Sequence, residues 1–137
     1  MRNNLALLAL MALAAPAIAQ DAPAGKMTVI DGDAVKRDEP PPHGNIGMST
    51  AYRYSDTVPG RAMEFRKRVL HVGAAIGAHR IEHDEVYYVL SGEGELTAGE
   101  EAYDAAPGTW LRMAANERHS VVARTPMVIA LYLLPAR

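Results

Sequence analysis

The sequence predicts an all-β fold. From Arg61 onward, short runs rich in Val, Tyr, Leu and Met are separated by Gly, Asn, Asp or Pro at intervals of about eight to twelve residues, which is typical of antiparallel strands joined by tight turns. Beyond the first residues of the chain, no segment has the length and periodicity of a convincing helix. Many short strands with tight turns fit a closed or nearly closed antiparallel barrel, because closure removes exposed sheet edges and encloses a small pocket.

The size and composition of the chain predict one domain. The chain has 137 residues, and a single hydrophobic core rarely needs more than roughly 150. Apolar residues make up 49% of the sequence, and 14 basic residues stand against 16 acidic ones with no long block of like charge. This balance argues against a nucleic-acid partner.

Residues 1–19 have the organisation of a secretory signal peptide. Arg2 precedes an apolar run over 5–15 that is too short to span a bilayer, and an Ala-Ile-Ala sequence ends at Ala19. The pattern predicts cleavage after Ala19, a periplasmic or secreted protein, and no membrane segment after cleavage. The alternative is a buried N-terminal helix, but nothing else in the chain resembles a helix against which it would pack. The chain has no cysteine, so neither a lipid anchor nor a disulfide is expected.

Residues 20–60 are expected to form an N-terminal arm and the first strand or strands, before a barrel core over 61–137. Within the arm, the segment 38–47 reads D-E-P-P-P-H-G-N-I-G, and consecutive prolines favour an extended conformation without internal hydrogen bonds. Such a segment suits a surface arm that crosses the domain as a lid, as a subunit contact or, most simply, as a connector. We expect His43 in this arm to be solvated and not to be a metal ligand.

The strands are expected where β-branched and aromatic residues accumulate between turn residues. Turn chemistry is clearest at 91–94 (Ser-Gly-Glu-Gly), 99–101 (Gly-Glu-Glu), 107–108 (Pro-Gly), 116–117 (Asn-Glu) and 125–126 (Thr-Pro). The expected strands are 27–30, 63–72, 75–81, 85–91, 95–98, 109–113, 119–124 and 127–134.

A cluster of imidazoles and carboxylates lies beside one of these strands. Residues 79–85 read H-R-I-E-H-D-E and include His79, His83 and Glu85. Imidazole nitrogen and carboxylate oxygen are ligands that divalent transition metals accept, and a chain without cysteine has few other ligands to offer. His119 supplies a further imidazole in a later strand. The alternative is a solvated strand face, where His and Glu are also common.

The spacing of this cluster resembles the first motif of the cupin family, whose members are double-stranded β-helix or jelly-roll barrels. That motif has Gly, five residues, His, one residue, His, three or four residues, Glu, six residues and Gly. The chain has Gly73, His79, Glu85 and Gly92 at these offsets, with Ile81 where the second His is expected. The resemblance covers roughly residues 61–135 and implies a small single-domain cupin.

The second cupin motif is degenerate in this chain. The motif normally has Pro-x-Gly, two residues, His, three residues and Asn. Here His119, within N-E-R-H-S-V-V-A, is the only candidate for its histidine, and Ala123 stands where the Asn is expected. The first motif is therefore the specific part of the resemblance.

The resemblance implies one mononuclear metal site. The usual cupin site has three His and one Glu, so Ile81 removes one imidazole, and His83 is the candidate that would compensate. The expected ligands are His79, Glu85 and His119, with His83 as a fourth whose participation stays open. The metal would be one divalent transition ion, with Fe, Mn, Ni, Zn and Cu all compatible with nitrogen and oxygen ligation. The resemblance also implies a homodimer.

Two side chains are candidates for catalysis beside the metal. Glu85 belongs to the expected ligand set, and Tyr87 shares its strand face by the period of two. The Tyr87 hydroxyl would orient a bound anion or a metal ligand, although a half-buried core tyrosine is the simpler interpretation. Arg112 is a candidate carboxylate clamp, with an exposed arginine as its simpler alternative.

The sequence thus predicts an exported metal-binding cupin-domain protein that acts as a metal-dependent enzyme on a small polar molecule, such as a sugar acid, an enediol or a phenolic compound. Whether the reaction is that of a dioxygenase, an isomerase or a lyase is open, because fold and reaction are only loosely tied. The alternative is a non-catalytic module that binds a small ligand or a metal, and Ile81 favours it. A metal-free acid and base pair of His79 and Glu85 is a further option. Serine, cysteine and phosphate-loop chemistries lack their sequence contexts.

Overall fold

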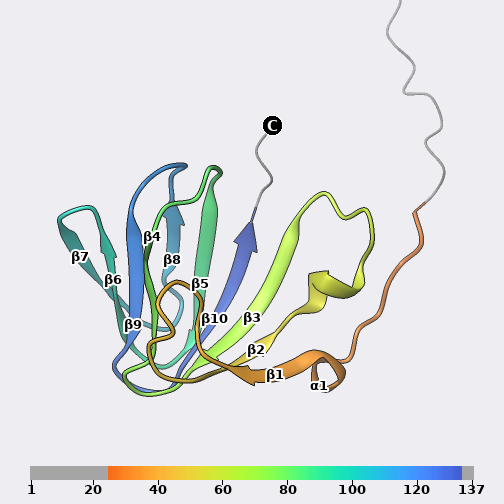
Figure 1. Ribbon diagram of the computed structural model, residues 1–137, viewed down its shortest axis with the longest axis horizontal. Helices are drawn as coiled ribbons and strands as arrows, with labels where there is room; N and C mark the ends of the chain where they lie inside the picture. Colours follow the sequence, from red (N-terminus) through yellow and green to blue (C-terminus); the bar gives the residue numbers. More distant parts are fainter. Residues whose placement is uncertain (1–24, 134–137) are drawn as a thin grey trace, which may run out of the picture.

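The structure is a computed structural model that describes residues 25–133. It consists of two antiparallel sheets with very little helix, and the prediction of an all-β fold is confirmed. The six-stranded sheet has the order β1-β2-β3-β10-β5-β8, and the four-stranded sheet has the order β4-β9-β6-β7. The two sheets face each other (Figure 1). The predicted signal peptide, residues 1–19, lies outside the described residues.

The strands of the six-stranded sheet are β1 (Lys36–Glu39), β2 (Ser49–Tyr52), β3 (Glu64–Leu70), β10 (Met127–Leu133), β5 (Glu85–Ser91) and β8 (Trp110–Met113). Those of the four-stranded sheet are β4 (Ala75–His79), β9 (His119–Ala123), β6 (Gly94–Ala98) and β7 (Glu101–Ala105). The short helices α1 (Gly32–Val35) and η1 (Tyr54–Thr57) complete the elements within the described residues. None of the helices in this part of the chain has the length and apolar character needed to cross a membrane.

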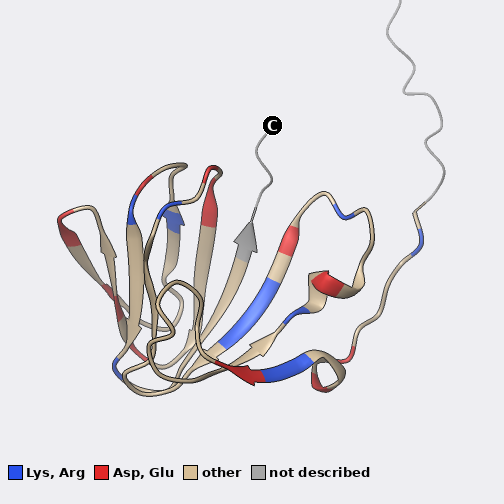
Figure 2. Ribbon diagram, in the orientation of Figure 1, with Lys and Arg blue, Asp and Glu red and all other residues tan. Residues whose placement is uncertain are grey.

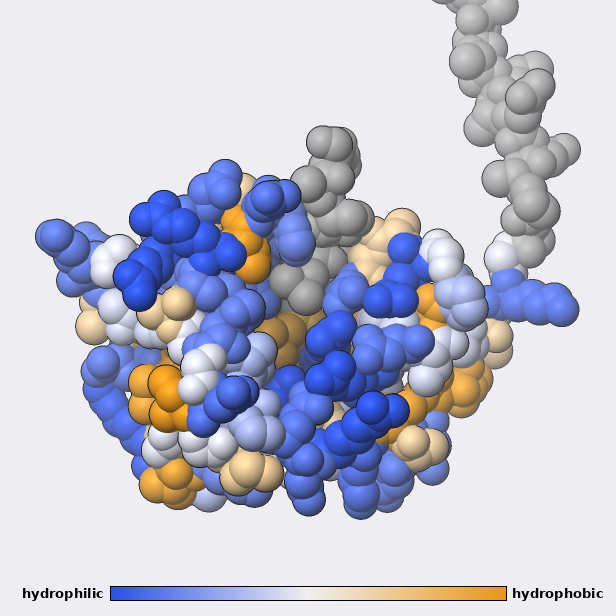
Figure 3. Space-filling model, viewed as in Figure 1, coloured by the Kyte–Doolittle hydropathy of each residue, from blue (hydrophilic) through white to orange (hydrophobic). Residues whose placement is uncertain are grey.

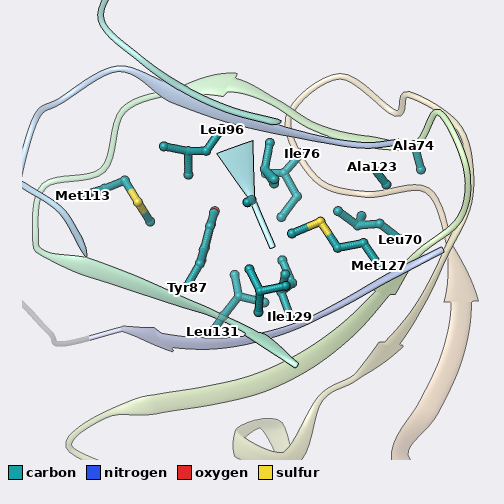
Figure 4. Close-up of a cluster of buried hydrophobic side chains, with 13 residues drawn as sticks. Leu70, Ala74, Ile76, Tyr87, Leu96, Met113, Ala123, Met127, Ile129 and Leu131 are labelled. Atoms are coloured by element: carbon teal, nitrogen blue, oxygen red, sulfur yellow. The ribbon is translucent and has the colours of Figure 1, made fainter. Parts of the chain in front are cut away.

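The core lies between the two sheets and follows the period of two. In β5, Tyr87 and Val89 are buried while Tyr88 and Leu90 are exposed, because successive side chains of a strand point to opposite faces. Side chains from both sheets meet in the cluster that Figure 4 shows. Its larger members include Leu70, Ile76, Leu96, Met113, Val121, Met127 and Ile129.

Three strands, β1, β2 and β7, were not expected from the sequence, and one expected strand, 27–30, is absent. Residues 27–30 form no strand, and Met27 and Val29 are exposed. The apolar residues of this segment have no neighbouring strand among the described residues with which to pair. In contrast, β1 and β7 are rich in charged residues and largely exposed. Each pairs with one neighbour at a sheet edge, where hydrophobic alternation is not required.

The proline-containing segment lies against the four-stranded sheet. The backbone N–H of Gly77 donates to the carbonyl of Pro42 at 3.2 Å, and Ile46 forms an isolated bridge with Ala75. Gly77 is required for this approach, because a Cβ there would lie 1.5 Å from the carbonyl oxygen of His43. The segment therefore docks on β4. It is not extended and unpaired throughout, in contrast to the expectation from the prolines, because residues 42–44 form a turn and Asp38 and Glu39 belong to β1.

Charge is unevenly distributed over the strands. Figure 2 shows a basic stretch on β3 that follows an acidic residue at its start, Glu64. On the face seen in Figure 3, hydrophobic residues form separate patches among hydrophilic ones. The basic stretch of β3 is notable because part of it faces the interior, as described below.

Candidate metal centre

Three side chains from three strands meet at one end of the barrel interior. His79 ends β4 and His119 begins β9, and these two residues are direct cross-strand partners. Glu85 begins β5 in the opposite sheet, and its Oε2 lies 2.9 Å from Nε2 of His119 and 3.8 Å from Nε2 of His79. One ligand atom from each of the three residues lies within 4.8 Å of the other two. We call this group the metal centre.

The hydrogen bonds of the two imidazoles orient them for metal binding. Nδ1 of His79 donates to the carbonyl of Gly77 at 2.8 Å, and Nδ1 of His119 donates to the carbonyl of Glu117 at 3.2 Å. Since Nδ1 carries the hydrogen in both rings, both Nε2 lone pairs are available toward Glu85. Metal-binding histidines commonly donate their other ring N–H to a backbone carbonyl in this way.

Two hydrogen-bond acceptors face each other in the metal centre, and a cation between them would satisfy both. Nε2 of His119 and Oε2 of Glu85 are both acceptors at 2.9 Å, an arrangement that a shared proton or a metal ion satisfies. Glu85 is 4% exposed and His119 is 1% exposed, so bulk water does not supply their hydrogen-bond partners. The donor set, two imidazole nitrogens and one carboxylate, therefore fits a divalent transition metal.

Burial also affects the protonation of His79. Desolvation holds the pKa of His79 below its usual value, and the neighbouring imidazoles of His119 and His43 act in the same direction. The carbonyl of Gly77 and the charge of Glu85 oppose this shift. A lowered pKa favours the neutral ring, which is the form that binds a metal.

A pocket of about 520 Å³ opens beside the metal centre. His79, Glu85 and Tyr87 contribute to its wall, as do Ile81 and His83. A volume of this size falls in the range of small-molecule sites.

His83 lies in the pocket wall but outside the three-residue group. β4 ends at His79, two residues earlier than expected, and residues 80–84 form an irregular connection to β5. His83 is half-buried in this connection, and the group of mutually close ligand atoms does not include it. Its ligation therefore stays a prediction. Ile81 places an apolar side chain in the wall where the cupin motif has an imidazole.

His43 is exposed, as expected, yet it belongs to the site. Its ring stacks on that of His79, with centroids 3.7 Å apart and an interplanar angle of 8°. Pro42 and His43 both line the pocket, so the proline-containing segment forms part of the wall and is more than a connector. No local sequence pattern signals this contact, because it depends on how the segment docks against Gly77.

Tyr87 is more buried than expected. It is 1% exposed, and its ring meets that of His119 edge-on at 6.0 Å. Burial, together with the nearby charge of Glu85, raises the pKa of Tyr87 well above its usual value, so the hydroxyl keeps its proton. Among the described residues, the hydroxyl makes no hydrogen bond of good geometry, and the carboxylate of Glu85 is the acceptor that lies near it.

The pocket wall also carries guanidinium groups that the sequence did not single out. Arg61, Arg66 and Arg68 all line the pocket, and we call them the arginine wall. Arg112, in contrast, is exposed and forms an ion pair with Asp84 at 2.6 Å. The exposed interpretation of Arg112 is therefore confirmed.

The chain has recognisable relatives. Residues 67–134 match the family model of the cupin domain (Cupin_2). An L-ectoine synthase of Nocardia farcinica (strain IFM 10152) is 33% identical over 70 residues, which cover 50% of this chain and 53% of that protein. The match thus spans about half the length of this relative.

Solved structures share the fold. A predicted oxalate decarboxylase from Thermotoga maritima aligns with a TM-score of 0.66 at 18% identity, covering 80% of this chain and 100% of the other. An RmlC-like cupin from Shewanella frigidimarina aligns with a TM-score of 0.65 at 18% identity, covering 82% and 94%. Together with the sheet topology and the first motif, these matches show that the chain belongs to the cupin family and has its jelly-roll fold.

Proposed function

We propose that the protein is a metal-dependent cupin enzyme that acts on a small polar molecule. The observation that carries the proposal is the convergence of two Nε2 atoms and one buried carboxylate at the edge of a pocket of about 520 Å³. His79, Glu85 and His119 would hold one divalent transition ion. Three protein ligands leave coordination positions open, which is the arrangement of a catalytic site.

The bound metal would supply Lewis acidity or a place for dioxygen. The residues of the chain have separate roles around it. The carbonyls of Gly77 and Glu117 orient the two imidazoles, and burial keeps bulk water from the carboxylate of Glu85. The pocket would hold the substrate against this centre.

A second candidate function is non-catalytic binding of a metal or a small ligand. The specific observation in its favour is Ile81, which lies in the pocket wall and offers no ligand atom. The relative from Nocardia farcinica supports the enzyme instead, because that protein is named as a synthase.

Metal content tests the first part of the proposal. We expect wild-type protein, purified without chelator from metal-replete medium, to contain about one transition ion per chain by elemental analysis. Variants His79→Ala and His119→Ala should lose it, and His83→Ala should show whether a fourth imidazole contributes. His71→Ala is the matched control, because His71 is exposed in the turn between β3 and β4. Wild-type protein without stoichiometric metal would refute the metal centre.

Turnover separates the two candidate functions. Metal-loaded protein would be incubated with sugar acids, enediols and phenols, and both product formation and binding would be followed. Product formation that disappears in Glu85→Gln supports the enzyme. Binding without product for any compound that saturates the pocket supports the non-catalytic module.

We also propose that the protein is exported, on the strength of the signal-like sequence at 1–19. Expression of the full chain in a bacterial host with fractionation should yield a periplasmic or secreted form. Its mass should correspond to a chain that begins at Gln20. An uncleaved cytoplasmic product would contradict export.

A further inference from the structure

Two members of the arginine wall, Arg66 and Arg68, lie on the inward-facing side of β3, which is unusual for a barrel, whereas Arg61 is exposed before the strand begins. Positions 64, 66, 68 and 70 alternate along β3, and the first three carry charges while Leu70 belongs to the core. Glu64, Arg66 and Arg68 also line the pocket. A barrel interior that served packing alone would place apolar side chains at such positions. The charges therefore call for an explanation other than packing.

Arg68 is the most buried member of the wall. Its side chain is 6% exposed, and it donates to Glu39 at 3.0 Å and to Ser49 at 2.6 Å. A guanidinium group has five N–H donors and no acceptor, so Arg68 retains donors for a ligand in the pocket that it lines. Burial lowers the pKa of Arg68, and the neighbouring guanidinium groups of Arg53 and Arg66 act in the same direction, while Glu39 opposes them.

The ion pairs around the wall leave an excess of positive charge. Glu39 is shared between Arg68 and Arg53, which contacts it at 2.8 Å. Within the described residues, the connected network consists of four guanidinium groups and three carboxylates: Arg53, Arg61, Arg66 and Arg68 with Glu39, Asp56 and Glu64. Glu85 also lines the pocket, and the proposed metal ion would neutralise its carboxylate. An anion in the pocket would then balance the remaining positive charge.

The Tyr87 hydroxyl is a second, independent donor in the same pocket. It is fully buried and lines the pocket, and the carboxylate of Glu85 is the near acceptor. No hydrogen bond of good geometry joins the two groups among the described residues, and a metal ion on Glu85 would occupy that acceptor. A buried polar group without a partner is costly unless a ligand or water satisfies it. Tyr87 extends from β5, two residues after Glu85, so this donor lies beside the metal centre and the arginine wall together.

We infer that the pocket binds the carboxylate group of a small organic acid through Arg68 and the Tyr87 hydroxyl, with the rest of the molecule directed toward the metal centre. This inference rests on the proposed function and selects among its substrate classes. Sugar acids and related small carboxylic acids fit it, whereas neutral enediols and phenols do not. Planar guanidinium groups match carboxylates well.

The test compares carboxylates with their neutral methyl esters. Calorimetry with metal-loaded protein would use D-galacturonate, D-glucuronate, lactate and pyruvate, each against its ester, with inorganic phosphate as a second kind of anion. We expect at least one acid to bind about tenfold or more tighter than its ester, as for a hydrogen bond to a charged group. If no acid is preferred over its ester, or if phosphate binds more tightly through Arg68 than every acid, the inference is overturned.

Variants then assign the preference to residues. Arg68→Gln should abolish it and Arg68→Lys should restore part of it, while Tyr87→Phe should weaken acid binding several-fold to about tenfold. If Arg68→Gln does not fold, Tyr87→Phe decides alone, and an unchanged preference there overturns the inference. Arg112→Gln is the matched control, because Arg112 pairs with Asp84 and does not line the pocket.

Metal analysis of the same samples separates this inference from the proposed function. Absence of metal from wild-type protein refutes the metal centre, whatever the acids do. Retained metal with no preference for acids over esters refutes the carboxylate site alone.

Discussion

The two ends of the barrel interior differ in chemistry although the same strands build both. At one end the inward positions are apolar and fully buried, and at the other they carry the ligands and the pocket. The pairs along two strands are Val89 and Glu85 on β5, and Val121 and His119 on β9. On β3 the charged Arg68 lies level with the core residue Ile129 of β10. Because inward positions recur every second residue, one strand supplies a stabilising core at one end and a reactive site at the other.

β4 also supplies one residue to the core and one to the metal centre, but its inward residues do not alternate regularly. Ile76 belongs to the core and His79 to the metal centre, although they are three positions apart and strict alternation would place them on opposite faces. The pairing of β4 with β9 shifts register between Ile76 and His79. Such an irregularity redirects a side chain, and here it allows both residues to face the interior.

The largest expected effect is the loss of stability at the apolar end. Ile129→Ala removes a fully buried side chain from β10 and should lower the free energy of unfolding by about 2–5 kcal/mol, because it leaves a cavity. Urea denaturation of metal-free protein measures this. The metal content of the folded variant should stay at the wild-type level. A cost below about 1 kcal/mol would show that this end is not the dominant core.

At the polar end the expected effect is on metal-linked stability. A metal at one hundred times its dissociation constant should stabilise the wild type by about 2.7 kcal/mol. In Glu85→Gln the amide keeps the shape of the carboxylate and can donate to Nε2 of His119, so metal-free stability should change little while the stabilisation by metal is lost. Thermal unfolding with and without Zn²⁺ measures both terms. Equal stabilisation of variant and wild type would contradict the proposed ligand.

Much of this arrangement could be predicted from the sequence. His79 and Glu85 follow from motif spacing, His119 from its place in a later strand, and β3 to β6 and β8 to β10 from apolar runs between turn residues. The structure brings the three residues of the metal centre together.

What was missed has no local apolar signal. β1 reads K-R-D-E and forms a strand because it pairs with β2. His43 meets His79 only because Gly77 lets a remote segment approach. The position of the Arg68 side chain depends on its ion pair with Glu39, which is 29 residues away in sequence, so no local pattern predicts it.

The contact of the proline-containing segment with β4 has a specific test. Gly77→Ala would place a Cβ 1.5 Å from the carbonyl oxygen of His43, so the segment must shift and the stacking of His43 on His79 should be lost. We expect a cost of about 1–3 kcal/mol, as for overpacking, and faster amide hydrogen exchange at Gly77. Gly60→Ala is the comparison, because its Cβ would meet no atom within 4 Å and only its positive φ of 68° opposes it. An equally protected amide at position 77 in wild type and in Gly77→Ala would contradict the docking.

The smallest expected effect concerns pH and depends on one imidazole at the polar end. In the unfolded chain the imidazole of His79 takes up a proton as the pH falls through about 6.5, whereas in the folded protein its lowered pKa delays this. The unfolded state then binds more protons, so the free energy of unfolding of metal-free protein should fall as the pH drops below about 6.5 and should be fully present above it. His79→Gln should flatten this slope and His71→Gln, at an exposed position, should not. Urea midpoints between about pH 5 and pH 8, the range in which histidine titrates, measure it. The same slope in wild type and in His79→Gln would mean that other groups dominate, and that burial of this ring at the polar end has no measurable cost for its protonation.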